Sequence, residues 1–171
     1  MTIEKISNTR SLTLQGRNAR LCCLDPGYGI HRLYRFPEGG FKPAPPQFRN
    51  GRLDPPVGRP DDYGMLYAAD SLLTAALECG ALLLMPPAQP TYEISLIAEA
   101  ELPPVKHVIL RATQKVKLVD FMDSATASAF GLNIDGVLDH LPPWRQAAAQ
   151  LIELLRQDMA YHDVVGVCYR S

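Results

Sequence analysis

Residues 63–80, YGMLYAADSLLTAALECG, bring together the local signals for a strand, a turn and a helix. The apolar run at 64–68 is typical of a buried strand. Asp70 and Ser71 come next, and both residue types favour the N-cap of a helix. An apolar helical face follows, which Gly80 is expected to end. That face consists of Leu72, Leu73, Ala75, Ala76 and Leu77. The stretch therefore predicts a strand–turn–helix unit.

Two polar side chains in this unit need an explanation. Tyr67 lies near the end of the predicted strand, and Glu78 lies in the last turn of an otherwise apolar helix. A carboxylate near the C-terminal end of a helix opposes the helix macrodipole. Spacing alone favours a surface position for Glu78 and a core position for Tyr67. The sequence on either side of the unit changes that balance.

Composition excludes several classes of protein. The chain has 171 residues, a net charge of -1, 47% hydrophobic and 20% charged residues, which is ordinary for a globular protein. A general nucleic-acid surface would need a basic surplus. The apolar run at 81–85 is too short to cross a membrane. The N-terminus lacks the apolar segment of a signal peptide. We therefore expect neither nucleic acid nor a membrane as a partner.

Cysteine and histidine residues give no pattern typical of a metal site. The four cysteines contain no CxxC pair, and adjacent Cys22 and Cys23 are poorly placed for a mutual disulfide. Free thiols of a cytosolic protein are expected. The histidines are scattered without ligand spacing. They are His31, His107, His140 and His162. No metal is predicted.

The rest of the chain reads as a mixture of strands and helices around one long loop. Alternation or apolar runs predict strands at 31–36, 92–100, 105–110, 116–121 and 164–169, the middle three as a meander. Helices are predicted at 124–130 and 144–159. Residues 37–62 form a loop rich in Pro and Gly. Its arginines Arg49, Arg52 and Arg59 suit a phosphate or carboxylate ligand, although a merely soluble loop explains them about as well.

Four residues follow one another along the chain, namely Arg52 in the loop, Tyr67, Glu78 and Ser171. This order resembles the RES domain family, which is named for its Arg, Glu and Ser. GRLDPP at 51–56 is similar to a segment of that family and contains Arg52. LYAADS at 66–71, followed by AALE at 75–78, matches the family's block from Tyr67 to Glu78. DVVGVCYRS at 163–171 resembles its closing strand and supplies Ser171. The resemblance covers residues 31–171, and Arg35, Arg49 and Arg59 stay open as alternatives to Arg52.

The resemblance implies an α+β fold similar to ADP-ribosyltransferases, with mixed or antiparallel sheets and flanking helices. We expect one domain over residues 1–171, with 1–30 as an N-terminal extension packed on it. The implied activity is that of a cytoplasmic toxin, with delivery by secretion left open. It would cleave the nicotinamide–ribose bond of NAD+, its substrate, without a metal. An Xre-type antitoxin or an immunity protein would cover the active site.

The residue types fit this chemistry. Glu78 would stabilise the positive charge that develops on the ribose. Arg52 would bind the pyrophosphate or the adjoining ribose, with Arg35 and Arg59 as further substrate-binding candidates. Tyr67 would stack on the nicotinamide, and Ser171 would hydrogen-bond its ribose or amide. The alternatives are an ADP-ribosyltransferase with a protein or small-molecule acceptor, an interbacterial effector, and a non-enzymatic NAD-binding module.

Overall fold

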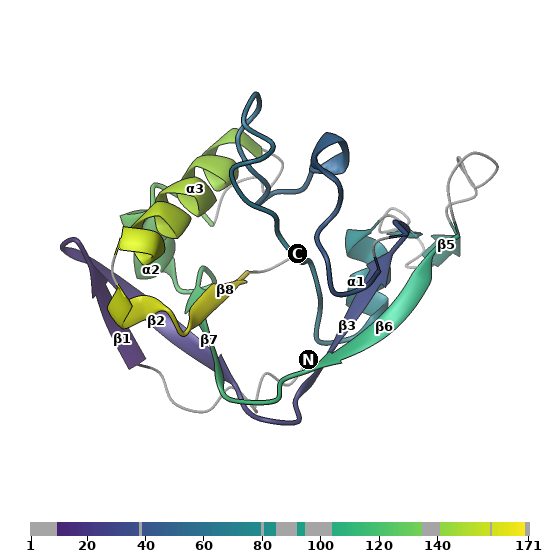
Figure 1. Cartoon of the computed structure of the whole chain (residues 1–171), viewed down its shortest axis with the longest axis horizontal. Coiled ribbons are helices and arrows are strands. Elements are labelled where there is room, and N and C mark those ends of the chain that lie inside the picture. Colours follow the sequence, from purple (N-terminus) through teal and green to yellow (C-terminus); the bar gives the residue numbers. More distant parts are fainter. Residues whose placement is uncertain are drawn as a thin grey trace. The chain divides into compact units, whose positions relative to one another are not determined.

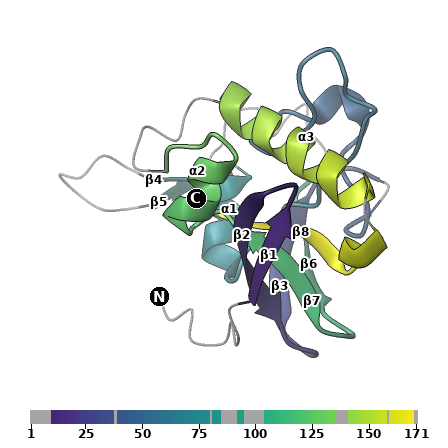
Figure 2. The ribbon, with the colours of Figure 1, turned by 90° about the vertical axis from the view of Figure 1, so that its left-hand side faces the viewer.

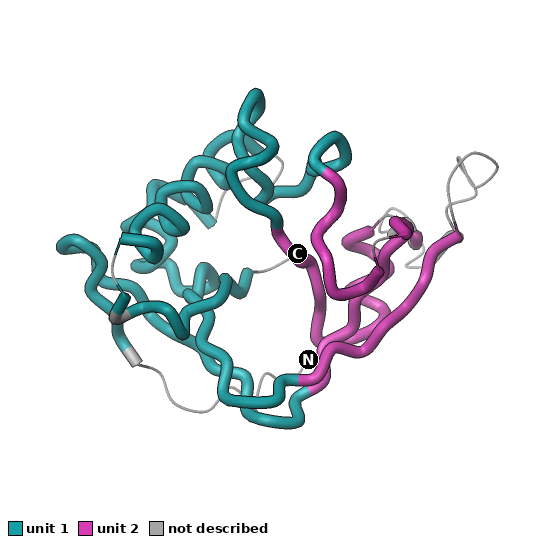
Figure 3. The backbone as a smooth tube through the Cα atoms, viewed as in Figure 1, with its two compact units in different colours: residues 1–28, 46–64, 112–170 teal, residues 29–45, 65–111, 171 magenta. Residues whose placement is uncertain are grey.

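The computed structural model describes residues 10–37, 39–79, 81–84, 92–94, 104–134, 141–157 and 159–169 (Figure 1). It confirms the α+β class, with mixed sheets and flanking helices. The chain forms two compact units (Figure 3). Unit 1 comprises residues 1–28, 46–64 and 112–170, and unit 2 comprises residues 29–45, 65–111 and 171. The prediction of one domain with an N-terminal extension stays a prediction.

Unit 1 is built on a four-stranded mixed sheet. Its strands are β1 (Arg10–Leu14), β2 (Arg17–Leu24), β7 (Val116–Asp120) and β8 (Val164–Cys168), in that spatial order. The first two pairings are antiparallel, and β7 pairs with β8 in parallel. Gln15 and Gly16 join β1 to β2 with φ values of 46° and 81°, as a two-residue hairpin turn requires. No strand was predicted within residues 10–24.

Helices complete the core of unit 1. α3 (Leu141–Gln157) buries Trp144, and the Trp144 ring centre lies 6.2 Å from that of Phe121 after β7. α3 begins three residues before its predicted start, because the prolines of its first turn need no amide donor there. Arg17 on β2 donates to Gln150 Oε1 at 2.9 Å, so a side-chain hydrogen bond connects α3 with the β1–β2 hairpin. Both elements are labelled in Figure 2. The shorter α2 (Ser124–Ala129) contacts β2.

Unit 2 holds two antiparallel pairs and one helix. β3 (Gly29–Tyr34) pairs with β6 (Lys106–Arg111), and β4 (Leu82–Leu84) pairs with β5 (Tyr92–Ile94). The predicted meander is therefore wrong, because β6 takes β3 as its partner while β7 takes β2 and β8. The remainder of the strand predicted at 92–100 lies outside the described residues.

The strand–turn–helix prediction is half right. α1 (Leu72–Glu78) starts as predicted, with the side chain of Ser71 accepting the Thr74 amide at 3.1 Å. It ends at a C-cap on Cys79, and Gly80 lies outside the described residues. Residues 64–68 are not a regular strand, although Ala69 forms an isolated antiparallel bridge with His31. A single bridge anchors the segment without making it part of a ladder.

The connections are short or irregular. A 3-10 turn, Pro46–Phe48, interrupts the Pro-rich loop, and another, Met159–Tyr161, precedes β8.

None of the helices in the described ranges combines the length and the apolar character needed to span a membrane.

Asp123, the N-cap of α2, gives a test of local stability. Its Oδ2 accepts the Thr126 hydroxyl at 2.7 Å and the Thr126 amide at 2.8 Å, and these bonds lower the pKa of Asp123. Asp123→Ala should lower the free energy of unfolding by about 1 kcal/mol at neutral pH, as measured by urea denaturation. Because the pKa is lower in the folded state, this contribution is present above the unfolded-state pKa of about 4 and is lost as pH falls through the folded-state value.

Asp123→Asn is the matched control, since an amide oxygen also caps a helix but carries no charge. It should keep most of the stability and lose the acid dependence at this position. An Asp123→Ala deficit of the same size in strong acid and at neutral pH would contradict the assignment.

Candidate functional site

Glu78 is the last residue of α1, and it is exposed. The helix buries Ala75 and Ala76 on its inner side and carries no basic residue in its last turn. The carboxylate therefore stands at a helix end whose dipole disfavours it. The helix was predicted to carry Glu78 at this end, and the structure confirms that position. Its catalytic role stays a prediction.

Tyr67 and Arg35 belong to the same unit as Glu78. Tyr67 is half-buried in the irregular segment before α1, and its carbonyl accepts a hydrogen bond from Arg32 Nη1 at 3.0 Å. Arg35 directly follows β3 and is also half-buried. Arg32 was not predicted to have a role. Arg32 lies within a predicted strand, where a charged residue normally faces solvent, yet only 5% of its surface is exposed.

Arg52 lies in unit 1, within a tight turn of the Pro-rich loop. Asp54 holds that turn, because its Oδ2 accepts the Gly51 amide at 2.6 Å and its own amide donates to the Gly51 carbonyl at 3.3 Å. Leu53, beside Arg52, is almost fully buried. The segment around Arg52 is thus anchored on both sides by packing and by backbone bonds.

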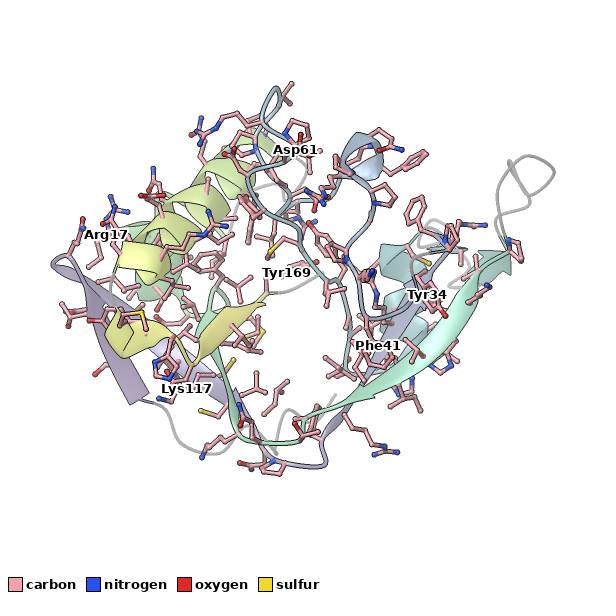
Figure 4. All side chains as sticks on the ribbon, viewed as in Figure 1. Arg17, Tyr34, Phe41, Asp61, Lys117 and Tyr169 are labelled. Atoms are coloured by element: carbon pink, nitrogen blue, oxygen red, sulfur yellow. The ribbon has the colours of Figure 1, made fainter. Side chains whose placement is uncertain are left out.

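Two aromatic rings contact the Arg52 guanidinium. Its central carbon lies 5.3 Å from the ring centre of Trp144 on α3 and 5.3 Å from that of Tyr169. Tyr169, labelled in Figure 4, follows β8. The two rings lie 6.0 Å apart. Cation–π contacts of this kind attract the guanidinium and limit its motion. The sequence carried no sign of this contact, because the three residues lie far apart in the chain.

The three arginines of the loop have different environments. Arg49 donates to the Pro60 carbonyl at 2.5 Å and to the Tyr63 carbonyl at 2.7 Å, so it cross-links the loop. Arg59 is exposed and pairs with Asp62 at 2.6 Å. Exposed ion pairs of this type contribute little to stability. Arg52 packs its guanidinium against the rings of Trp144 and Tyr169, and its choice as the functional arginine of the loop stays a prediction.

Tyr63, at the end of the same loop, is a half-buried titratable residue whose hydroxyl is buried. Burial raises its pKa to about 12, and the carboxylates of Asp54 and Asp62 act in the same direction. Its hydroxyl has no hydrogen-bond partner in the described part of the chain. Arg145 on α3 is buried as well and donates to the Pro55 carbonyl at 3.4 Å. Tyr63 therefore stays neutral at physiological pH and does not serve as a base.

The structure corrects the description of the histidines as scattered. His31 on β3 and His107 on β6 stack with ring centres 5.2 Å apart, and Nδ1 of His31 lies 3.0 Å from Nε2 of His107. Neighbours across a strand pair cannot be recognised from sequence spacing. In the described ranges, no cluster of three or more His, Cys, Asp or Glu residues is arranged to hold a metal ion.

The cysteines are free thiols, as predicted. A hydrogen bond with the Cys22 thiol, burial and the Asp120 carboxylate raise the pKa of Cys168 far above its ordinary value. Such a thiol is a poor nucleophile, because the thiolate is the reactive form. The raised pKa therefore disfavours the reactive thiolate form of Cys168 next to Tyr169.

Among the predicted site residues, Tyr67, Glu78 and Arg35 belong to unit 2, and Arg52 and Arg59 belong to unit 1. Ser171 lies outside the described residues. Tyr67 and Glu78 lie on adjacent elements of unit 2. Ala69, which forms the bridge with His31, lies between Tyr67 and the start of α1.

Comparison with protein families supplies the remaining evidence. The family model of the RES domain matches residues 27–171, which include every predicted site residue. Comparisons with curated proteins and with solved structures gave no match. RES domains are associated with toxin–antitoxin systems. Because the match covers most of the chain, this protein belongs to the RES domain family.

Proposed function

We propose that this protein is a toxin that cleaves NAD+ between nicotinamide and ribose. The observation that carries the proposal is the exposed carboxylate of Glu78, at the end of α1 and inside the RES match. Membership of the RES family suggests an enzymatic toxin that acts on NAD. The helix macrodipole disfavours a carboxylate at this helix end, which supports a role in function.

The proposed reaction breaks the bond between the ribose C1′ and the nicotinamide nitrogen. The bonding electron pair leaves with nicotinamide and neutralises its ring, while positive charge develops on the ribose. A water molecule then adds at C1′ and loses a proton, which gives ADP-ribose. The carboxylate of Glu78 stabilises the ribosyl cation electrostatically, and this stabilisation is strongest when the charge is fully developed.

The other predicted residues bind and orient the substrate. Arg52 forms charge-assisted hydrogen bonds with the pyrophosphate or the adjoining ribose, and its contacts with Trp144 and Tyr169 restrict its orientation before substrate arrives. Tyr67 stacks on the nicotinamide ring. Ser171 hydrogen-bonds the nicotinamide ribose or its amide. Arg35 and Arg59 are the alternative arginines for the phosphate groups.

The proposal extends to fold and partner. We infer an ADP-ribosyltransferase-like fold, which the α+β class with mixed sheets supports. Family membership implies a toxin–antitoxin partner in general terms. An Xre-type antitoxin or an immunity protein that covers the active site in the cytoplasm is our specific proposal for that partner. NAD+ is the substrate, and the proposed chemistry requires no metal.

Glu78→Gln should separate stability from activity. Glutamine keeps the shape of the side chain and removes the unfavourable interaction with the helix dipole, so the melting temperature should equal or slightly exceed that of the wild type. The rate of NAD+ cleavage should fall by about 100-fold or more, because a neutral amide cannot stabilise the ribosyl cation. Thermal denaturation and a continuous NAD+ assay measure the two quantities.

Glu153→Gln provides the control, since Glu153 is an exposed carboxylate on α3 that accepts a bond from Gln157 at 2.9 Å. It should leave the rate unchanged. A Glu78→Gln protein that melts like the wild type and cleaves NAD+ at the wild-type rate would remove Glu78 from the site.

Arg52→Ala should mainly weaken substrate binding. The loss of charge-assisted hydrogen bonds should raise KM by a factor corresponding to about 1.5–3 kcal/mol. Arg17→Ala is a matched control in the same unit, because Arg17 lies 5.5 Å from the Phe130 ring centre and has no proposed contact with substrate. If Arg52→Ala retains wild-type kinetics while Arg35→Ala or Arg59→Ala is inactive, the functional arginine has been misassigned.

Expression of the protein alone in bacteria should stop growth and deplete cellular NAD+. The Glu78→Gln protein, expressed to the same level, should do neither, because it lacks the proposed catalytic carboxylate. Growth curves and NAD+ measurements in cell extracts provide the comparison. Normal growth and normal NAD+ in cells that contain folded wild-type protein would rule out the toxin function for this chain.

A further inference from the structure

Arg32 is the most deeply buried charged residue described in unit 2. It lies in the middle of β3, and its exposed fraction is 5%. Burial lowers the pKa of Arg32, and the guanidinium remains protonated at any physiological pH. A buried cation is costly unless it is well hydrogen-bonded, so the bonds it makes indicate its purpose.

The two arms of the guanidinium bind two different segments. Nη1 donates to the Tyr67 carbonyl at 3.0 Å, and Nη2 donates to the Lys42 carbonyl at 2.9 Å. The planar fork of arginine fixes the angle between these two bonds. Arg32 thereby attaches both the loop that follows β3 and the segment before α1 to the same strand.

The loop at Lys42 has little room to move away. Gly40 is buried, and a Cβ atom there would lie 2.5 Å from Cγ1 of Val108 on β6 and 3.0 Å from the ring of Tyr34. The backbone of the loop therefore lies close against the β3–β6 pair. This close approach fixes the Lys42 carbonyl, which in turn fixes the orientation of the Arg32 guanidinium.

The segment before α1 has a second attachment next to the first. The His31 amide donates to the Ala69 carbonyl at 2.7 Å, and the Ala69 amide donates to the His31 carbonyl at 2.8 Å. The Arg32 side chain and the His31 backbone thus hold residues 67 and 69, which flank Ala68. With two attachment points so close together, the segment can neither slide along β3 nor rotate about it.

We propose that Arg32 is the positioning residue for Tyr67, holding its backbone in the orientation that presents the ring to the substrate. This inference rests on the proposed function of Tyr67 in NAD+ binding. Arg32 itself does not contact the substrate. Arg32 restricts the motion of the Tyr67 backbone before NAD+ binds. Pre-organisation of this kind lowers the free-energy barrier for the reaction of the bound substrate.

Stability alone does not explain an arginine at this position. Its Nε is buried and has no hydrogen-bond acceptor among the described residues. A buried donor without an acceptor opposes folding. A smaller or apolar side chain would avoid that penalty, but it could not hold two carbonyls at a fixed angle.

The test uses the full chain with Arg32→Lys and the stronger change Arg32→Gln. Lysine keeps the charge but lacks the fork, so it should reduce kcat/KM for NAD+ by about tenfold or more, the loss expected for one charge-assisted hydrogen bond. Arg111→Lys is the control, because Arg111 is an exposed arginine on β6 in the same unit. It should retain the wild-type value. Arg32→Lys supplies the result if Arg32→Gln fails to fold.

A double-mutant cycle distinguishes positioning from a general structural role. In a Tyr67→Ala background, Arg32→Lys should cause little further loss of activity, because the side chain that it orients is gone. The Ala69 amide should exchange its hydrogen faster in Arg32→Lys than in the wild type. An undiminished loss in the Tyr67→Ala background, or wild-type activity with wild-type exchange at Ala69, would overturn the proposal.

Failure of the proposed function gives a different result. If the wild-type protein leaves NAD+ intact, the enzymatic assignment is wrong whatever Arg32 does. The attachment of the Tyr67 segment is then decided by hydrogen exchange alone. Faster exchange at Ala69 in Arg32→Lys, but not in Arg111→Lys, supports that attachment, and equal exchange refutes it.

Discussion

The pair of backbone hydrogen bonds between His31 and Ala69 determines where the candidate catalytic elements of unit 2 begin. Residues 64–68 form no regular strand, so this bridge and the Arg32 bond to the Tyr67 carbonyl attach the segment to β3. Tyr67 thereby lies beside β3, and Ser71, the N-cap of α1, follows two residues after Ala69. One helix of seven residues then carries Glu78 to its exposed end. The positions of both residues follow from this bridge, the Arg32 bond to the Tyr67 carbonyl and a capped helix.

Arg32 and Arg52 organise the two units in different ways. Arg32 uses the fork geometry of its guanidinium to hold two carbonyls, whereas Arg52 uses the flat face of the group against Trp144 and Tyr169. Lysine would reproduce neither arrangement, because its ammonium is a point charge without a planar face. The Arg52 contact also joins three distant segments of unit 1, namely the Pro-rich loop, α3 and the end of β8. Arginine is thus both a candidate ligand-binding residue and a structural element in this fold.

Local signals in the sequence predicted local structure well. Ser71 caps α1, the prolines at 142 and 143 lie in the first turn of α3, and Glu78 ends its helix. The order of the motifs was enough to indicate the RES family, which the family match confirms. Pairings between distant segments could not be predicted. The local hairpin of β1 and β2 was missed although polar and apolar residues alternate in β1, a pattern typical of a strand. The partner of β6, by contrast, is β3, which lies far away in the chain. The contact of Arg52 with Trp144 spans ninety-two positions for the same reason.

The central claim is that the chain hydrolyses NAD+, and the most direct measurement is an analysis of products. Purified protein is incubated with NAD+ and an excess of candidate protein acceptors, and nicotinamide, free ADP-ribose and modified protein are quantified by mass spectrometry. We predict that nicotinamide and free ADP-ribose appear in equal amounts as NAD+ disappears. Nicotinamide accompanied by ADP-ribose bound to protein would contradict hydrolysis in favour of transfer, and NAD+ that remains intact would contradict the enzymatic function altogether.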